Sequence, residues 1–141
     1  MSTPVKQKVT ILQGTTQRVP FDRQYVEYAI EGSECSGYRN ACTGAPVPPG
    51  DFIDEDYTGC EARLQLRESV DSETVLWEMT TTNGRIELAG KRLTLIFEAA
   101  DSSGFAFQET GAVGQVEVVR PNGDVERHYD LTFALDREGT R

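Results

Sequence analysis

Three cysteines and one histidine are the residues of this sequence with the clearest chemical potential. Cys35 and Cys42 are separated by six residues that include Gly37, a spacing that can close a small disulfide loop. The chain-entropy model assigns roughly 2–3 kcal/mol to so short a loop. The alternative is a pair of free thiols in a reducing compartment. Cys60 falls on the inward face of a predicted strand, where cysteine acts as a small apolar residue.

Two metal sites are conceivable, and the residue spacing disfavours both. A zinc site would need Cys35, Cys42, Cys60 and His128, but these lack the C-x₂₋₄-C spacing of zinc knuckles. A calcium site would draw on four clustered acids: Asp51, Asp54, Glu55 and Asp56. This cluster lacks the alternating ligands and the central glycine of a calcium loop. The sequence therefore favours a solvated acidic turn and predicts no metal or cofactor.

Catalysis and nucleic-acid binding are also disfavoured. His128 falls on the polar side of a predicted strand, and no nucleophile motif such as G-x-S-x-G accompanies it. The formal net charge is −9, from 14 Lys and Arg against 23 Asp and Glu, whereas nucleic acid requires a basic surface. The same charge opposes docking on anionic lipid, and no apolar run approaches the roughly 20 residues that span a bilayer. We therefore expect a non-enzymatic protein that binds neither nucleic acid nor membrane.

The elements that would position these residues follow a period of two. Cys60, Ala62, Leu64 and Leu66 alternate with charged and polar residues, which is typical of a half-buried strand. Similar stripes lie near residues 9–11, 26–30, 75–79, 91–98, 113–119 and 124–135. Asn83-Gly84 and Asn122-Gly123 predict type I′ turns, Ala89-Gly90 predicts a weaker turn, and residues 99–103 predict one short helical turn. The pattern predicts an all-β, antiparallel sandwich of seven to eight strands.

Residues 31–59 break this rhythm with five glycines, three prolines and two of the cysteines. A loop this long in a compact domain is typically functional or disordered. It is either a tolerated surface insertion or a contact element for a neighbouring protein. We therefore divide the chain into an N-terminal strand or arm, 1–16, and a sandwich domain, 17–141, with a long loop at 31–59.

The order of motifs resembles a group of tailed-phage structural proteins. Val9-Thr10-Ile11-Leu12-Gln13-Gly14-Thr15-Thr16 is similar to their apolar first strand and its Q-G-[DT]-T turn. Asp56-Tyr57-Thr58-Gly59 stands where that group has D-L-T-G before an alternating strand. The segments 74–79, 83–86 and 92–95, Asn122-Gly123 and the terminal Thr140-Arg141 follow in the same order. The resemblance covers nearly the whole chain, although the loop at 31–59 is much longer than its counterpart.

This resemblance implies an immunoglobulin-like fold similar to the N-terminal domain of baseplate upper proteins. It implies a structural component of a tailed-phage virion, assembled in the host cytoplasm, that links the tail core to peripheral fibres and self-associates under particle symmetry. The alternatives are a capsid-surface decoration protein and a small carbohydrate-active sandwich. The residues that we expect to contact other virion proteins are Val9, Ile11, Tyr38, Phe52 and Tyr57, because free strand edges and aromatic side chains anchor interfaces.

Overall fold

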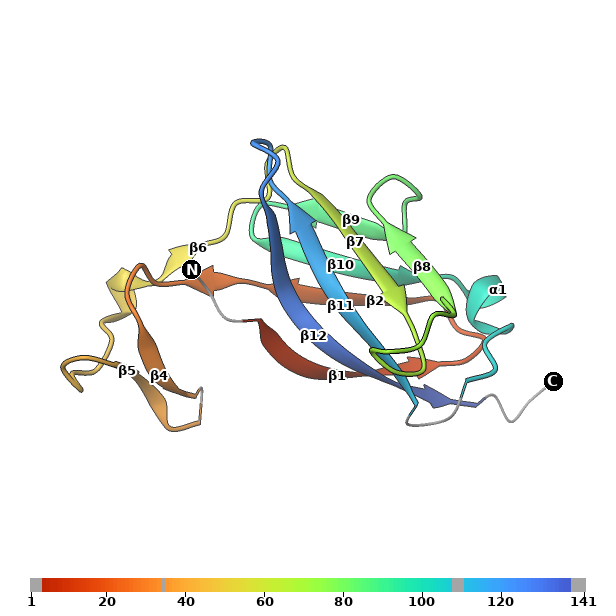
Figure 1. Ribbon diagram of the computed structural model, residues 1–141, viewed down its shortest axis with the longest axis horizontal. Coiled ribbons are helices and arrows are strands. Elements are labelled where there is room, and N and C mark those ends of the chain that lie inside the picture. The colour runs from red at the N-terminus through yellow and green to blue at the C-terminus, as the bar shows by residue number, and fades with distance from the viewer. Residues whose placement is uncertain (1–3, 34, 108–110, 138–141) are drawn as a thin grey trace.

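The computed structural model describes residues 4–33, 35–107 and 111–137, and strands are its main secondary structure (Figure 1). A five-stranded sheet has the order β1 (Val5–Leu12), β12 (Val125–Asp136), β11 (Ala112–Val119), β7 (Glu61–Leu66) and β8 (Trp77–Thr80). A three-stranded sheet has the order β2 (Gln17–Asp22), β10 (Arg92–Phe97) and β9 (Ile86–Ala89). The expectation of an all-β fold is confirmed. The predicted helical turn is α1 (Ala99–Ser102).

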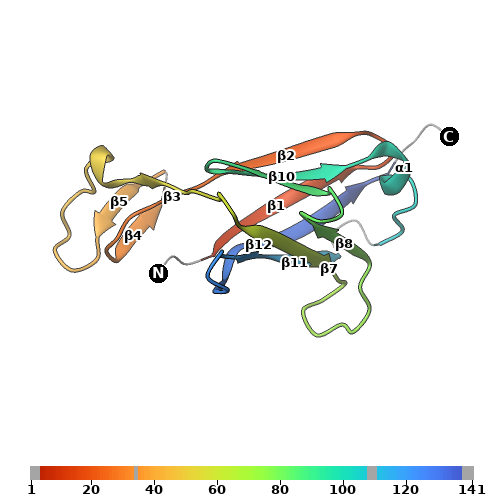
Figure 2. The same ribbon diagram turned by 90° about the horizontal axis from the view of Figure 1, so that it is seen from above.

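The two sheets face each other as layers, and we call this two-layer unit the body (Figure 2). Alternation along the strands creates the core between the layers. In β7 every second residue is buried, and in β10 the alternating Leu93, Leu95 and Phe97 are fully buried. These side chains meet Phe133 and Leu135 from β12 in one continuous hydrophobic cluster. Burial of each such side chain contributes about 1.5–3 kcal/mol.

The N-terminal segment belongs to the body. β1 pairs with β12 along its whole length, from Val5↔Tyr129 to Leu12↔Asp136, and the pairing is parallel. Val9 and Ile11 are buried in the core. The five-stranded sheet is therefore mixed, and the prediction of a purely antiparallel sheet is wrong at this strand pair. A boundary after residue 16 would divide the core.

Residues 24–54 form a projection that we call the lobe, at the left of Figure 1. It contains β3 (Gln24–Tyr25), β4 (Ile30–Ser33), β5 (Gly37–Asn40), the 3₁₀ turn η1 (Pro49–Asp51) and β6 (Ile53–Asp54). β4 and β5 form an antiparallel hairpin, and β3 pairs with β6 at the base of the lobe. The predicted long loop at 31–59 thus contains most of a hairpin, a 3₁₀ turn and a short strand. Of the predicted strand at 26–30, only Ile30 is in a strand, β4.

The two Asn-Gly turns differ from the prediction. A type I′ turn needs positive φ at both central residues, but only Gly84 (φ 78°) and Gly123 (φ 94°) have it. The Gly123 N–H donates to the Arg120 carbonyl, so Pro121 and Asn122 form the turn that joins β11 to β12, with Gly123 next to it. Asn83-Gly84 connects β8 to β9 and therefore crosses between the sheets. The prediction of type I′ hairpins is wrong at both positions.

A β-bulge in β12 changes the side on which its residues lie. Val116 pairs with Tyr129, but Glu117 pairs with Arg127, so His128 is an extra residue in the ladder. An extra residue reverses the alternation of the strand that carries it. His128 is therefore 1% exposed, and the prediction that it lies on the polar face is wrong.

Candidate functional site at the base of the lobe

Six polar side chains, four of them almost fully buried, gather where the lobe joins the body. His128 from the bulge lies beside Tyr57 and Glu126, and the chain between β6 and β7 contributes Glu55. Arg23 lies between β2 and β3, and Arg120 follows β11. Arg23 and Glu55 are each 4% exposed at the side chain, which is rare for charged residues unless they are paired. We call these six residues the buried network.

The buried network is a continuous chain of hydrogen bonds and ion pairs. Arg120 donates from Nη1 to Glu55 Oε1 (2.7 Å) and from Nη2 to Glu126 Oε1 (2.9 Å). The second carboxylate oxygen of Glu55 forms an ion pair with Arg23 Nε at 3.4 Å. Two arginines and two glutamates thus balance one another, which is the condition under which buried charges are tolerated.

The pKa values of the network follow from burial and from Arg120. Burial raises the pKa of Glu55, but the hydrogen bond and charge of Arg120, with smaller contributions from His128 and the Asp56 N–H, together lower it below its ordinary value. The Arg120 hydrogen bond holds the pKa of Glu126 at about 2, against opposition from burial and with help from His128. Burial lowers the pKa of His128 and raises the pKa of Tyr57. Both glutamates are therefore ionised at neutral pH, and the histidine and the tyrosine are uncharged.

These protonation states fix the histidine tautomer. His128 Nε2 lies 2.8 Å from Glu126 Oε1, and an ionised carboxylate can only accept, so Nε2 carries the proton. His128 Nδ1 then accepts a hydrogen bond from the Tyr57 hydroxyl at 3.0 Å. Both side chains are almost fully buried. The geometry suits a structural network that joins the lobe to the body, because a reactant could not reach either group.

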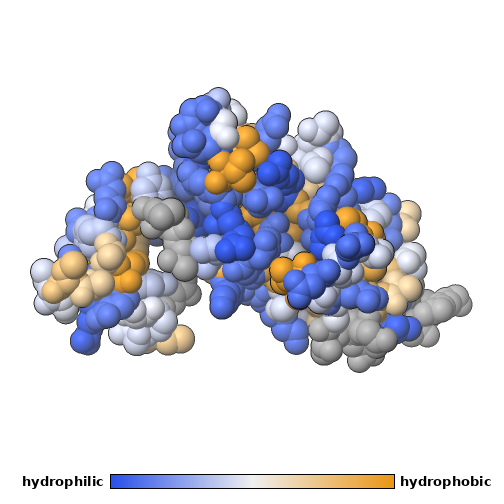
Figure 3. Space-filling model, in the orientation of Figure 1, coloured by the Kyte–Doolittle hydropathy of each residue, from blue (hydrophilic) through white to orange (hydrophobic). Residues whose placement is uncertain are grey.

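Beside the network, a groove of about 980 Å³ separates the lobe from the body. Its lobe side carries the aromatic residues Tyr25, Tyr28, Tyr38 and Phe52. Tyr38 and Phe52 pack edge to face with their ring centroids 6.0 Å apart, and the Tyr28 hydroxyl donates to Asp51 Oδ2 at 2.6 Å. Hydrophobic side chains reach the surface of the lobe (Figure 3). Rings held in place in this way suit an interface.

The first strand of the body forms part of the same groove. β1 is the last strand of its sheet, so one of its edges pairs with no strand that the structure describes. The Gln17 side chain covers the far end of this edge, since it accepts from the Leu12 N–H (3.1 Å) and donates to the Thr10 carbonyl (2.9 Å). Val5, Lys6 and Gln7 instead line the groove. The groove therefore combines aromatic side chains with an open strand edge.

The predicted interface residues divide into two groups. Tyr38 and Phe52 are partly exposed in the groove. Tyr57 is 2% exposed, so the prediction that its side chain contacts a partner is wrong. Val9 and Ile11 lie, as expected, on a strand that pairs along a sheet edge: β1 pairs with β12 of its own sheet, and their side chains are buried in the core. The buried network was missed, because its residues are far apart in the sequence and share no motif, whereas a strand edge around Val9 was expected.

Of the two alternatives for Cys35 and Cys42, a disulfide or free thiols, the structure has free thiols, and Cys60 is free as well. Cys35 lies in the turn of the β4–β5 hairpin, beyond the pair Ser33↔Gly37. Cys42 lies past Asn40, at the opposite end of that hairpin. The hairpin strand from Gly37 to Asn40 separates the two cysteines, and three extended residues span about 10 Å. A disulfide needs Cα atoms within about 7 Å, so the two cysteines are too far apart to form one.

Within residues 4–33, 35–107 and 111–137, no three or more His, Cys, Asp and Glu side chains are grouped so that they could hold a metal ion. None of the helices in those ranges has the length and apolar character needed to cross a membrane.

No profile of a protein family matches the sequence, and a search of curated proteins finds no match. The functional argument therefore rests on the fold and on the groove.

Proposed function

We propose that this protein is a non-enzymatic structural subunit of a tailed-phage virion, an adaptor that joins the tail core to peripheral fibres. It docks to neighbouring virion proteins, including copies of itself, through the groove between the lobe and the body. The observation that carries the proposal is the combination, in one groove, of fixed aromatic rings and an unpaired strand edge. An extended segment of a neighbour would add a strand to β1 and place its side chains against the rings.

The connectivity of the body supports the immunoglobulin-like part of this proposal. Without the lobe strands, β2, β10 and β9 take the places of strands B, E and D. β12, β11, β7 and β8 take the places of strands G, F, C and C′. The lobe is then an insertion in the B–C loop, and the β11–β12 hairpin is the F–G loop. In immunoglobulin variable domains, these two loops lie at the end that binds the partner.

The make-up of the lobe supports a docking role as well. None of the described residues between 24 and 54 is buried, while Ile30 and Ile53 are each 36% exposed. A projection without a buried core that presents tyrosines and isoleucines is typical of a surface completed by a partner. The buried network explains how such a projection keeps a defined position on the body.

Particle composition and position on the particle test the proposal. Mass spectrometry of purified particles from the encoding phage should detect the protein, and a labelled copy should appear at the tail or baseplate in electron micrographs. Its absence from the particle would refute the virion assignment. A label on the head would refute the adaptor role and support the decoration alternative.

A paired substitution tests the groove. Tyr38→Ala with Phe52→Ala should reduce incorporation into particles at least tenfold while the isolated protein keeps its melting temperature within a few degrees. Val70→Ser provides the control, because Val70 is 70% exposed on the loop between β7 and β8 and does not line the groove between the lobe and the body. Equal incorporation of both variants would exclude the groove as the docking site.

A further inference from the structure

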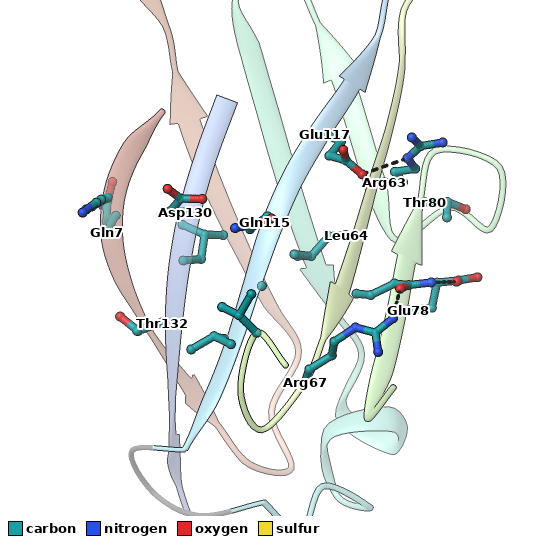
Figure 4. Close-up of a pocket in the computed structure, with 16 residues that line it drawn as sticks. Gln7, Arg63, Leu64, Arg67, Glu78, Thr80, Gln115, Glu117, Asp130 and Thr132 are labelled. Carbon is teal, nitrogen blue, oxygen red and sulfur yellow. Dashed lines mark hydrogen bonds and ion pairs between the residues drawn. The ribbon is translucent and has the colours of Figure 1, made fainter. Parts of the chain in front are cut away.

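The outer face of the five-stranded sheet forms a second groove, of about 700 Å³, that does not depend on the lobe (Figure 4). Its volume lies within the range of small-molecule sites. This face is turned to the viewer in Figure 3 and is mainly hydrophilic. The lining comes from five strands, so the sheet itself fixes the positions of the side chains.

The strand register places polar residues in a row across the sheet. Lys6 on β1 pairs with Asp130 on β12, and Asp130 pairs with Gln115 on β11. On the other side of the row, Gln65 on β7 pairs with Glu78 on β8. β11 and β7 are antiparallel and Glu117 pairs with Arg63, so Gln115 lies opposite Gln65. The row of polar residues therefore continues across all five strands. Neighbouring strands are about 4.8 Å apart, so this row offers a regular series of hydrogen-bonding groups.

The ends of the groove are internally paired, but its centre is not. Arg63 Nε donates to Glu117 Oε1 at 3.2 Å, and Gln65 Nε2 donates to Glu78 Oε2 at 2.9 Å. Asp130 Oδ1 is shielded from solvent and accepts no hydrogen bond from a described residue, and its ion pair with Arg127 Nε is 3.6 Å long. A carboxylate group that lacks donors within the protein is stabilised when a ligand or water supplies them.

The charges of the groove select the ligand class. Three cations, Lys6, Arg63 and Arg67, line it together with three carboxylates, Glu78, Glu117 and Asp130. The carboxylates would repel a polyanion, and the cations would repel a polycation. A neutral ligand is repelled by neither set of charges. If its groups both donate and accept hydrogen bonds, as hydroxyl groups do, it can bond to the cations and to the carboxylates. An extended peptide would instead seek a strand edge, because its hydrogen-bonding groups belong to its backbone.

We infer that this polar groove binds a neutral oligosaccharide, with Asp130 and Gln115 as the central hydrogen-bonding pair. The Asp130 side chain is 28% exposed although its Oδ1 is shielded, so its carboxylate can accept from a sugar hydroxyl on the exposed side, and the Gln115 amide both donates and accepts. Val113, one row further along β11, and Val70 on the rim supply apolar contact for the carbon–hydrogen face of a sugar ring. The inference concerns a face separate from the lobe and stands or falls independently of the virion assignment.

Nuclear magnetic resonance titration tests the inference. The intact ¹⁵N-labelled protein would be titrated with defined neutral oligosaccharides, namely the gluco-, manno-, galacto- and xylo-series, each to about 20 mM, a range suited to weak open sites. Saturable shifts of the Gln115, Asp130 and Gln65 amides with at least one series are expected. No saturable shift with any series, or shifts confined to other faces, would overturn the inference. So would tighter binding of an acidic or a basic peptide at these amides.

Substitutions then assign the ligand to the central pair. Gln115→Ala and Asp130→Asn should each weaken oligosaccharide binding at least tenfold, and the amide spectrum will show whether each variant is folded. Thr94→Ala on β10 is the matched control, since it lies on the opposite sheet and should leave the affinity unchanged. Equal affinity of all three variants would contradict the assignment, and the wild-type shift map remains an independent test if a variant unfolds.

Discussion

The body and the lobe are held together by different forces. The body has a continuous core of buried hydrophobic side chains from both sheets. The lobe has no buried residue among those described between 24 and 54, and it depends on strand pairing, side-chain turns and one aromatic contact. For example, Asn40 Oδ1 accepts from the Cys42 and Thr43 N–H groups. The difference indicates that the body folds on its own core and the lobe takes its position from the buried network.

The largest effect should come from a charge placed in the core of the body. Phe133 is 1% exposed, so Phe133→Asp should lower the free energy of unfolding by about 4 kcal/mol or more. Chemical denaturation followed by tryptophan fluorescence would measure this. Thr132→Asp is the matched control, because Thr132 is exposed and pairs with Lys8, so its change should stay within about 0.5 kcal/mol. Similar losses in both variants would contradict the core described above.

Breaking the buried network should have the next largest effect on the free energy of unfolding. Glu55→Ala leaves Arg23 and Arg120 without their shared carboxylate, and removal of one partner from a buried pair costs about 3–5 kcal/mol. Hydrogen exchange should show the greatest loss of protection in the lobe and the β11–β12 turn. Asp54→Ala is the control, since its ion pair with Lys91 and its hydrogen bond from Gln24 are both exposed, and exposed contacts of this kind add little to stability. Equal protection of the lobe in both variants would show that the network does not hold it.

Acid should destabilise the junction before the core. Burial lowers the pKa of His128 in the folded state, so the unfolded chain binds a proton first as the pH falls below the ordinary value of 6.5. Stability is therefore complete above pH 6.5 and declines below it, by at most about 1.4 kcal/mol per pH unit for one proton. Glu126, with a pKa of about 2 against 4.5, adds a second loss between pH 4.5 and 2. Because its side chain is 42% exposed, this second loss should amount to about 1 kcal/mol.

Denaturation curves at pH 7.5, 6 and 5 would measure the first step. His128→Gln should flatten the dependence between pH 7.5 and 5, since glutamine does not titrate and its amide can still face Glu126. An unchanged slope in this variant would assign the acid sensitivity to other groups.

The same contrast explains what the sequence could predict. Alternation in residues 60–66, 93–97 and 129–135, broken only at Ile96, revealed the core strands because burial on one face imposes a period of two. The lobe has no buried face and hence no period, so its hairpin was interpreted as a loop. His128 was misplaced because a bulge reverses the alternation without leaving a clear sequence signal. The buried network joins residues from 23 to 128, and pairings over such separations are visible only in the folded chain.

The smallest effect on stability should come from removing most of the lobe. Replacing residues 27–51 with Gly-Ser-Gly keeps β3, β6 and the buried Glu55, and the pair Tyr25↔Ile53 leaves the two cut ends next to each other. The deleted residues contribute nothing to the hydrophobic core, so the free energy of unfolding should change by less than about 1 kcal/mol. Calorimetry would measure this change, and incorporation into particles should be lost because Tyr38 is removed with the β4–β5 hairpin. A parallel replacement of residues 69–74, between β7 and β8, controls for loop shortening and should preserve incorporation. A large loss of stability in the lobe variant would mean that the lobe supports the body, and the separation of the two regions would then be wrong.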